Sequence, residues 1–348
     1  MRIHELKQRL ADAGAGPSHE HRVLRLWSNA LPRSSGKRKP ESFFPASLMA
    51  ALPAIEDGLA ALARIHSIHP GADGSERLLV ALADGQTVES VLLPRGGLCV
   101  SSQVGCAVGC QFCMTGREGL IRQVGSAEII AQVALARARR PVRRVVFMGM
   151  GEPSHNLDNV MEAIELLGTA GNIGHKDLVF STVGDPRAFE RLPQGRVKPA
   201  LALSLHTTRA DLRRRLLPRA PALSPEDLVE ACERYARATG HPVQYQWTLL
   251  EGVNDGPDEI EGIVRLLSGK RAVLNIIPFN SVEGVPFGRP PWERCRQMAR
   301  TLHDRGILAK LRDSAGQDVD GGCGQLRARA AEVRVPVVIR KVEDLHAA

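Results

Sequence analysis

From Leu98 onward the sequence alternates between short apolar segments and longer amphipathic ones. Short apolar runs bounded by helical patterns are typical of buried strands. We expect strands at Leu98–Ser102, Val145–Met148, Leu178–Ser181, Ala200–Leu205, Val243–Leu250 and Val273–Ile277. Helices are expected at Ala127–Arg139, Asn159–Leu167, Pro225–Ala238, Asp258–Leu267 and Trp292–Arg305. Strands separated by helices predict an α/β fold with a parallel sheet and right-handed crossovers. A partial (β/α)6 barrel and an open doubly wound sheet would both fit.

The N-terminal part follows another pattern. Arg2–Leu10 and His21–Leu31 have apolar residues at helical spacing, and residues 34–40 form a basic loop. Leu78–Leu82 and Thr87–Leu93 alternate like the two strands of a hairpin. We therefore predict a small helical accessory domain at 1–60, a hairpin extension at 61–94, a core barrel at 95–322 and a C-terminal segment at 323–348.

The chain has a net charge of +8 and a pI near 9.4. A basic surplus suits a polyanionic partner such as RNA, because each neutralised phosphate releases counterions. An Arg-rich composition without a nucleic-acid role would give the same charge. The sequence shows neither a secretory signal nor an apolar run of membrane-spanning length. We therefore expect a cytoplasmic protein with no membrane partner, and a monomer.

The sequence contains seven cysteines, and four of them crowd into one segment. Cys106, Cys110 and Cys113 form a C-x3-C-x2-C run directly after the first expected strand. Three thiolates on one loop can hold three irons of a [4Fe–4S] cubane and leave the fourth iron open for a ligand. The alternative is a structural zinc site, but such a site wants four ligands and usually pairs two C-x2-C halves. The run has no second pair, so the spacing favours the cluster.

This spacing resembles that of the radical S-adenosylmethionine (SAM) superfamily. The string Arg95–Cys106 resembles the family that methylates carbon 2 of adenine in 23S ribosomal RNA and transfer RNA. Further matches, in family order, are Phe147–Pro153, Asn156–Val160, Ser204–His206, Gly252–Asp255, Ile277–Asn280 and Asp320–Leu326. The resemblance covers roughly residues 86 to 328 and implies a radical SAM barrel, with the cluster on Cys106, Cys110 and Cys113. It also implies that SAM is bound by Gly151, Glu152, Ser181, Ser204, Leu205, His206 and Asn280.

The positions of the matching residues agree with the expected strands. In (β/α) barrels the chemistry lies at the carboxyl ends of the strands. Cys106 follows the first expected strand, Glu152 follows the second, Ser181 ends the third, His206 ends the fourth, and Asn280 follows the last. Taken singly, each has a simpler interpretation, such as a strand-to-helix turn around Glu152 or a rim histidine at position 206. Together they predict one site.

Two cysteines outside the run also match the family. A lone cysteine is usually a small buried hydrophobe, which suits Cys232 and Cys295, but Cys323 lies in a Gly-Gly-Cys-Gly loop. The resemblance implies that one SAM methylates Cys323. A second SAM, cleaved at the cluster, gives a 5′-deoxyadenosyl radical that takes a hydrogen atom from the S-methyl group. Cys99 then resolves the RNA–CH2–S–Cys323 adduct through a transient disulfide, and Glu89 matches the proton acceptor. The alternative for Glu89 is an exposed glutamate on an edge strand.

Several choices stay open at this point. The RNA could be ribosomal, transfer or another transcript, and the methylated atom could be carbon 2 or carbon 8, since both outcomes use the same two cysteines. A one-electron reductant such as flavodoxin is expected. The alternatives are a radical SAM enzyme with a non-RNA substrate and a non-catalytic RNA-binding protein stabilised by an iron–sulfur cluster or zinc.

Overall fold

The computed structural model describes residues 1–282 and 284–328. Most of the predicted C-terminal segment, residues 329–348, lies outside these ranges. The α-helices are α1 Ile3–Asp12, α2 Pro17–Ser28, α3 Pro40–Phe43, α4 Ala46–Ala60, α5 Ser126–Arg137, α6 Leu157–Gly168, α7 Pro186–Arg191, α8 Ala210–Leu216, α9 Pro225–Thr239, α10 Pro257–Leu267 and α11 Trp292–Asp304. Short 3-10 turns are η1 Pro153–Asn156, η2 His175–Asp177, η3 Leu192–Gln194 and η4 Gln317–Val319.

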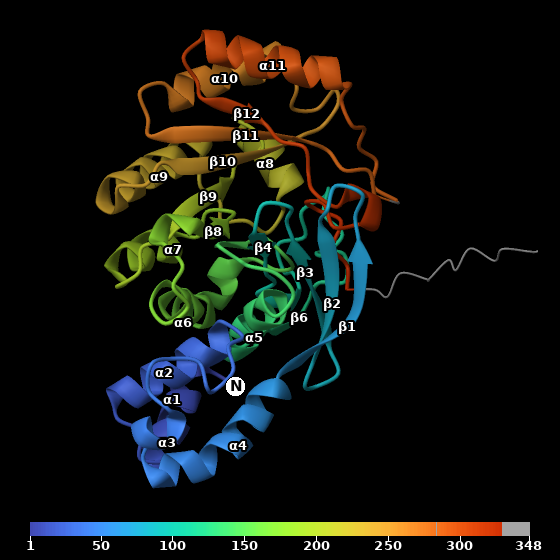
Figure 1. The fold of residues 1–348 in the computed structure, drawn as a ribbon. Coiled ribbons are helices and arrows are strands. Elements are labelled where there is room, and N and C mark those ends of the chain that lie inside the picture. The colour runs from blue at the N-terminus through green and yellow to red at the C-terminus, as the bar shows by residue number, and fades with distance from the viewer. Residues whose placement is uncertain (283, 329–348) are drawn as a thin grey trace, which may run out of the picture.

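One large sheet organises the described residues (Figure 1). The strands are β1 Ala63–Pro70, β2 Glu76–Leu82, β3 Thr87–Leu92, β4 Gly97–Cys99, β5 Gln103–Gly105, β6 Leu120–Gln123, β7 Arg144–Phe147, β8 Leu178–Thr182, β9 Ala200–Ser204, β10 Val243–Leu249, β11 Ala272–Pro278 and β12 Ala309–Leu311. The ten-stranded sheet has the order β1-β2-β3-β4-β7-β8-β9-β10-β11-β12, and β5 pairs with β6 in a separate ribbon. Pairing is parallel from β4 to β12 and antiparallel from β1 to β4.

The predicted α/β fold with a parallel sheet is confirmed, and all six predicted strands are present. Their apolar residues form the core: Val145, Phe180, Leu201 and Leu274 are completely buried. Helices α5–α7 and α9–α11 lie along the outer side of the sheet (Figure 1). The strand predicted at Leu98–Ser102 ends at Cys99, because the chain beyond it bends toward the loop after β7, where the amide of Ser102 donates to the carbonyl of Met150 at 2.9 Å.

The N-terminal helices α1–α4 gather at one end of the molecule (Figure 1). Their apolar faces pack into the same hydrophobic core as the sheet, and Leu6, Leu10 and Leu48 are fully buried. The amide of Ile3 donates to Ser126 Oγ at 2.8 Å, which ties α1 to the start of α5. No helix in the described part of the chain is long and apolar enough to cross a membrane. The domain boundaries near residues 60, 94 and 322 stay predictions.

The predicted hairpin is present as β2 and β3, and β1 adds a third antiparallel strand to it. Asp84 and Gly85 form the turn between β2 and β3, where Gly85 has a φ of +85° that favours glycine. Strand β3 pairs in turn with β4, so that Val91 lies opposite Cys99. The hairpin is therefore part of the same sheet that carries the cysteine segment.

Candidate active site

A cavity lies at the carboxyl ends of the parallel strands, where the sequence predicted a site. Ten of the thirteen predicted site residues line it: Cys99, Cys106, Cys110, Cys113, Gly151, Glu152, Ser181, Ser204, His206 and Cys323. The other three, Glu89, Leu205 and Asn280, do not line the cavity. Leu205 is fully buried in the hydrophobic core, whereas Glu89 and Asn280 hold the loop that carries Cys323.

The three cysteines of the C-x3-C-x2-C run share the loop between β5 and β6. The two ends of this loop are joined by the Cys106 amide, which donates to the carbonyl of Gly119 at 2.9 Å, and its middle is held by the Gln111 amide, which donates to the carbonyl of Leu216 at 3.0 Å. Burial, together with the neighbouring charges of Glu152 and Cys113, raises the pKa of the Cys106 thiol to about 12. Burial also raises the pKa of Cys110, as do the charges of Cys113 and Cys106.

These pKa shifts test whether the loop fits an iron–sulfur cluster. Burial and neighbouring charge oppose the ionisation of the Cys106 and Cys110 thiols. A bound metal cation would favour their thiolate forms, because metal binding displaces the thiol protons. Within the described residues, no three His, Cys, Asp or Glu side chains are arranged to hold a metal ion as they stand. The donor chemistry fits a cluster on Cys106, Cys110 and Cys113, although the side chains are not preassembled around it.

The loop after β7 approaches the cysteine loop closely because of its glycines. A Cβ on Gly149 would lie 2.7 Å from the carbonyl carbon and oxygen of Val100. Gly151 has a φ of +106°, and its Cβ would lie 2.6 Å from the Cβ of Gln103. Neither position tolerates a side chain without a shift of residues 100–103. The glycines therefore bring Glu152 against the cavity wall.

Glu152 is a buried carboxylate fixed by three short contacts. One carboxylate oxygen accepts from Ser154 Oγ at 2.6 Å and from the Ser154 amide at 3.1 Å, and the other accepts from the Val183 amide at 3.0 Å. Burial raises its pKa, while the bonds from Ser154 and Thr182 lower it. The Glu152 amide donates to Gln103 Oε1 at 2.8 Å. This arrangement leaves a positioned acceptor group at the edge of the cavity.

His206 lies at the end of β9 in a strained conformation. Its φ of +63° places a non-glycine residue in the left-handed region, which is costly and clusters at functional sites. The Thr248 amide donates to Nδ1 at 3.0 Å, and the ring of Phe112 packs edge-on at 4.8 Å. Burial, with a smaller contribution from the charge of Arg213, lowers the pKa of His206 to about 3. The imidazole is therefore neutral at physiological pH and donates only through Nε2.

Cys323 enters the cavity on the loop that follows η4. The carbonyl of Cys323 accepts from Asn280 Nδ2 at 3.0 Å. The carbonyl of Gly324 accepts from the amide of Met114, the residue just after the cysteine run, at 2.8 Å. Solvent reaches Cys323 because it faces the open cavity. The surrounding protein nevertheless raises the pKa of its thiol, and so does the charge of Cys113. Asn280 keeps a buried Oδ1 that has no partner among the described residues, so an acceptor is available to a bound ligand.

Cys99 ends β4, and its thiol faces the same cavity as Cys323. Burial raises the pKa of the Cys99 thiol well above its usual value, and the charge of Cys323 raises it further. The two sulfur atoms are therefore electrostatic neighbours. All seven cysteines are free in this structure, so the predicted transient disulfide is not formed here.

Glu89 is fully buried, which excludes the alternative of an exposed edge-strand residue. One of its carboxylate oxygens accepts from the Arg77 guanidinium, and the other accepts from the amides of Arg327 and Ala328 at 2.8 and 3.1 Å. Arg77 Nε donates in turn to the carbonyl of Val319 at 2.5 Å. The pair thus fastens both flanks of the Cys323 loop to the hairpin. Its role as a proton acceptor stays a prediction.

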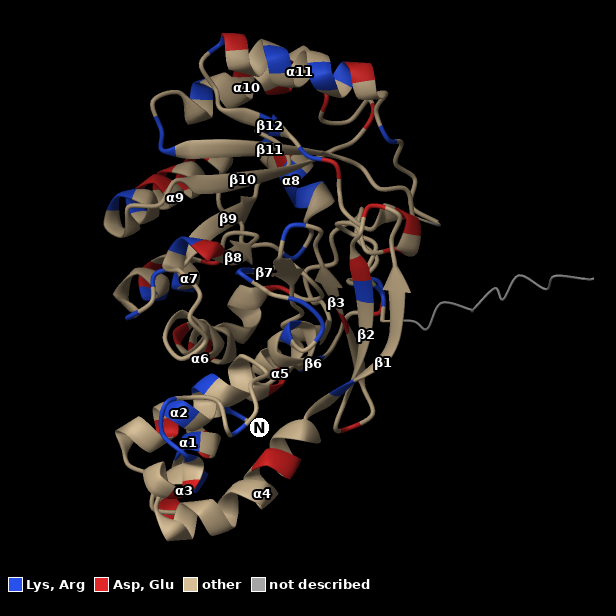
Figure 2. Ribbon diagram, viewed as in Figure 1, with Lys and Arg blue, Asp and Glu red and all other residues tan. Residues whose placement is uncertain are grey.

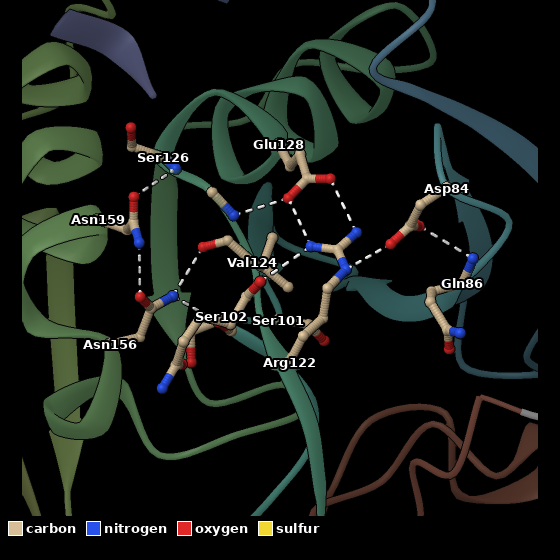
Figure 3. Close-up of polar contacts among 12 residues, drawn as sticks. Asp84, Gln86, Ser101, Ser102, Arg122, Val124, Ser126, Glu128, Asn156 and Asn159 are labelled. Carbon is tan, nitrogen blue, oxygen red and sulfur yellow. Dashed lines mark hydrogen bonds and ion pairs between the residues drawn. The ribbon is translucent and has the colours of Figure 1, made fainter. Parts of the chain in front are cut away.

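A second polar network fastens the elements around the cysteine loop (Figure 3). Arg122 on β6 donates to both oxygens of Glu128 on α5 at 2.9 Å, and it pairs with Asp84 in the hairpin turn at 2.6 Å. Asn156 Nδ2 donates to the carbonyls of Ser102 and Val124 at 2.7 Å, and Asn159 donates to Asn156 Oδ1 at 2.7 Å. The matched segment Asn156–Val160 therefore holds the scaffold and does not line the cavity.

Sequence reasoning missed three polar residues of the site. Gln103 positions the Glu152 amide, Thr248 positions His206, and Arg213 donates to the carbonyls of Val183 and Ser204. Gln103 stands within the matched string Arg95–Cys106 but was given no role there, whereas Thr248 and Arg213 stand in no motif that the sequence singled out. The apolar spacing of Leu212 and Leu216 on α8 was a weak signal, since Arg213 follows on the same buried side of that helix.

Comparisons with known proteins agree with this geometry. Residues 100–267 match the family model of the radical SAM superfamily. A probable RNA methyltransferase of Leptothrix cholodnii is 71% identical over 329 residues, covering 94% of this chain and 95% of the relative. A probable RNA methyltransferase of Pseudomonas aeruginosa is 64% identical, covering 97% and 99%. The crystal structure of a radical SAM methyltransferase from Sphaerobacter thermophilus superposes with a TM-score of 0.81 at 34% identity, covering 94% and 98% of the two chains. This chain therefore belongs to the radical SAM superfamily and, within it, to the family of these probable RNA methyltransferases.

Proposed function

We propose that this protein methylates a ring carbon of an adenine in RNA through a methyl group carried on Cys323. The observation that carries the proposal is the meeting of five cysteines at one cavity: Cys99 and Cys323 face it together with the three cysteines of the run. A single structural metal site would use three or four of them. A methyl carrier and a resolving thiol account for the remaining two.

The family implies a [4Fe–4S] cluster and SAM, and we propose that Cys106, Cys110 and Cys113 hold the cluster. When bound, these groups supply one-electron cleavage of SAM and hence a means of removing a hydrogen atom. We propose that the remaining predicted residues bind SAM: Gly151, Glu152, Ser181, Ser204, Leu205, His206 and Asn280. Leu205 would act through the backbone, because its side chain lies in the core.

A radical on the methylene carbon bonded to the Cys323 sulfur would overcome the low reactivity of the adenine ring carbons toward an electrophilic methyl group. The amidine-type ring carbons of adenine are electrophilic, so an electrophilic methyl group cannot attack them, whereas a carbon radical can add. In our proposal the methyl group on Cys323 loses a hydrogen atom to the 5′-deoxyadenosyl group that SAM cleavage would supply, and its carbon bonds to the ring. The ring then gives up a proton and one electron, and an oxidised [4Fe–4S] cluster would take that electron. Cys99 attacks Cys323 Sγ, an S–S bond forms, and the S–C bond breaks with its electrons moving to the product carbon, which takes a proton.

Glu89 is the proposed acceptor of the ring proton. In the described conformation both of its oxygens are occupied, by Arg77 and by the two amides that follow the Cys323 loop. It could reach the substrate only if residues 327 and 328 moved away. We further propose that a flavodoxin-type reductant supplies the electron and that the protein acts as a cytoplasmic monomer.

The product is tested directly by mass spectrometry of RNA. We expect ribosomal or transfer RNA from a strain lacking this protein to have lost one methyladenine nucleoside. The purified, reconstituted enzyme should restore it with the methyl carbon from labelled SAM. Chromatography against 2-methyladenosine and 8-methyladenosine standards decides the carbon. Unchanged RNA, with SAM cleavage retained, would instead indicate a non-RNA substrate.

The basic loop before α3 is the proposed phosphate-binding element of the helical segment. Lys37, Arg38 and Lys39 are exposed, and Arg22 braces their loop by donating to the carbonyl of Arg38 at 2.8 Å. Basic residues also lie on α9 and α11 (Figure 2), so net charge alone does not locate the RNA.

Neutralising Lys37, Arg38 and Lys39 should flatten the dependence of RNA affinity on salt. If all three contact phosphates, the slope of log K against log salt falls by up to about three units. Titrations at several salt concentrations measure it. The matched control neutralises Arg296, Arg300 and Lys310, which are also exposed but lie at the other end of the molecule. Equal slopes for both triple variants would remove the loop from the RNA interface.

A further inference from the structure

Arg213 is a buried cation that this chain leaves partly unpaired. The residue is 3% exposed, and its Nη2 donates to the carbonyls of Val183 at 2.6 Å and Ser204 at 3.1 Å. Its Nε and Nη1 are shielded from solvent and have no partner within the described residues. Buried donors that make no hydrogen bond are destabilising, and more so when they belong to a charged group. Such a cost points to a partner outside the chain.

The carbonyls that Arg213 binds place its guanidinium at the ends of β8 and β9, beside the cavity. Val183 also donates to Glu152, and Ser204 lines the cavity wall. None of the described carboxylates forms an ion pair with Arg213. Burial lowers its pKa to about 10, whereas the charges of Cys110 and Glu152 raise it. The guanidinium therefore stays protonated beside the cavity.

Helix α8 packs directly on this loop. Leu212 and Leu216 belong to one apolar cluster with Cys106, Val108 and Phe112. The carbonyl of Leu216, at the end of the helix, accepts from the Gln111 amide in the middle of the cysteine run. Arg213, one helical turn earlier, is thus held by the same helix that supports the loop. The two arginines that follow Arg213 on this helix have other surroundings, because Arg214 is exposed and Arg215 pairs with Asp211 at 3.5 Å.

We infer that Arg213 is a positioning residue for the iron–sulfur cluster and holds a fixed positive charge on the helix that packs against the cysteine loop. The three thiolates leave an oxidised cubane with a net negative charge, and one-electron reduction adds another. A nearby cation therefore stabilises the reduced form more than the oxidised form. Net charge and hydrogen bonds to the sulfurs are known determinants of cluster potential. The inference concerns the cofactor alone and needs no RNA substrate.

The test is a redox titration of the anaerobically reconstituted protein without SAM, followed by electron paramagnetic resonance. In Arg213→Met the reduction equilibrium should shift at least tenfold toward the oxidised cluster, which for one electron is a midpoint potential about 59 mV lower. Arg213→Lys keeps the charge and should recover most of this shift. Arg214→Met, the exposed neighbour, should match the unchanged protein.

The outcomes separate a charge effect from a structural one. If Arg213→Met retains its irons with the potential of Arg214→Met, the inference is wrong. A loss of SAM affinity by calorimetry at an unchanged potential would also overturn it, since the guanidinium would then serve the SAM carboxylate. If Arg213→Met fails to keep the cluster, Arg213→Gln is titrated against Arg213→Lys. Equal potentials for these two variants would overturn the inference, whereas a lower potential for the Gln variant supports it.

Discussion

Replacing Cys106, Cys110 or Cys113 with Ala should abolish cofactor binding and with it all SAM cleavage. The unchanged protein should take up about four irons per chain on anaerobic reconstitution, and each variant should lose most of them together with the broad visible absorbance. The physical reason is that the loop has one thiol for each of three irons, so no other thiol of the loop can replace a lost ligand. Iron and sulfide analysis with absorption spectra measures the effect.

Cys232 and Cys295 supply the matched controls. Both are fully buried in the hydrophobic core, outside the cavity, and replacing either with Ala should leave the iron content unchanged at a stability cost of about 1 kcal/mol. A protein that holds one zinc and no iron after reconstitution would contradict the whole assignment, and the mechanism proposed above would fail with it.

The sequence predicts well those site residues that directly follow a strand of the parallel sheet, because the apolar pattern of each strand is local. Short apolar runs marked six of the seven strands in the parallel part of the sheet, and only the short edge strand β12 was missed. Parallel strands present their carboxyl ends on one edge. Residues that follow those strands, such as Glu152 and His206, therefore had to converge. Leu205 was assigned to the site only because its motif surrounds it, and the structure buries its side chain in the core.

Contacts between distant segments lay beyond the sequence. Arg77 faces Val91 in the hairpin register, which makes Glu89 its diagonal neighbour on the same face. The pairing register of β2 and β3 cannot be predicted from the two strand sequences alone. The packing of residues 319–328 on Arg77 and Glu89 is a tertiary contact, which no local pattern predicts. The unpaired nitrogens of Arg213 are likewise visible only once α8 is packed on the cysteine loop. These missing signals are contacts of buried polar and charged side chains between distant segments, which sequence patterns do not report.

The strongest test of the proposed route is that Cys323→Ala and Cys99→Ala should fail at different steps. Cys323→Ala removes the atom that carries the methyl carbon, so it should bind and cleave SAM but transfer no methyl group to RNA. Cys99→Ala keeps the carrier and removes the thiol that faces it across the cavity. It should stall one step later, with RNA joined to Cys323 through a methylene group. Both variants should lose at least three orders of magnitude in product formation, comparable to the loss of a covalent nucleophile.

A denaturing gel with and without nuclease shows the adduct, and peptide mass analysis places the added carbon on the segment that contains Cys323. The double variant Cys99→Ala/Cys323→Ala is the control, and it should show no adduct because the carrier is gone. A packing role for the two cysteines predicts lower melting temperatures in both single variants and an adduct in neither. Since Cys99 is partly buried and Cys323 faces the open cavity, packing would also cost more at Cys99 than at Cys323. Full methylation by Cys323→Ala, or no adduct in Cys99→Ala supplied with SAM, reductant and a verified RNA, would sink the two-cysteine assignment while leaving the cluster assignment intact.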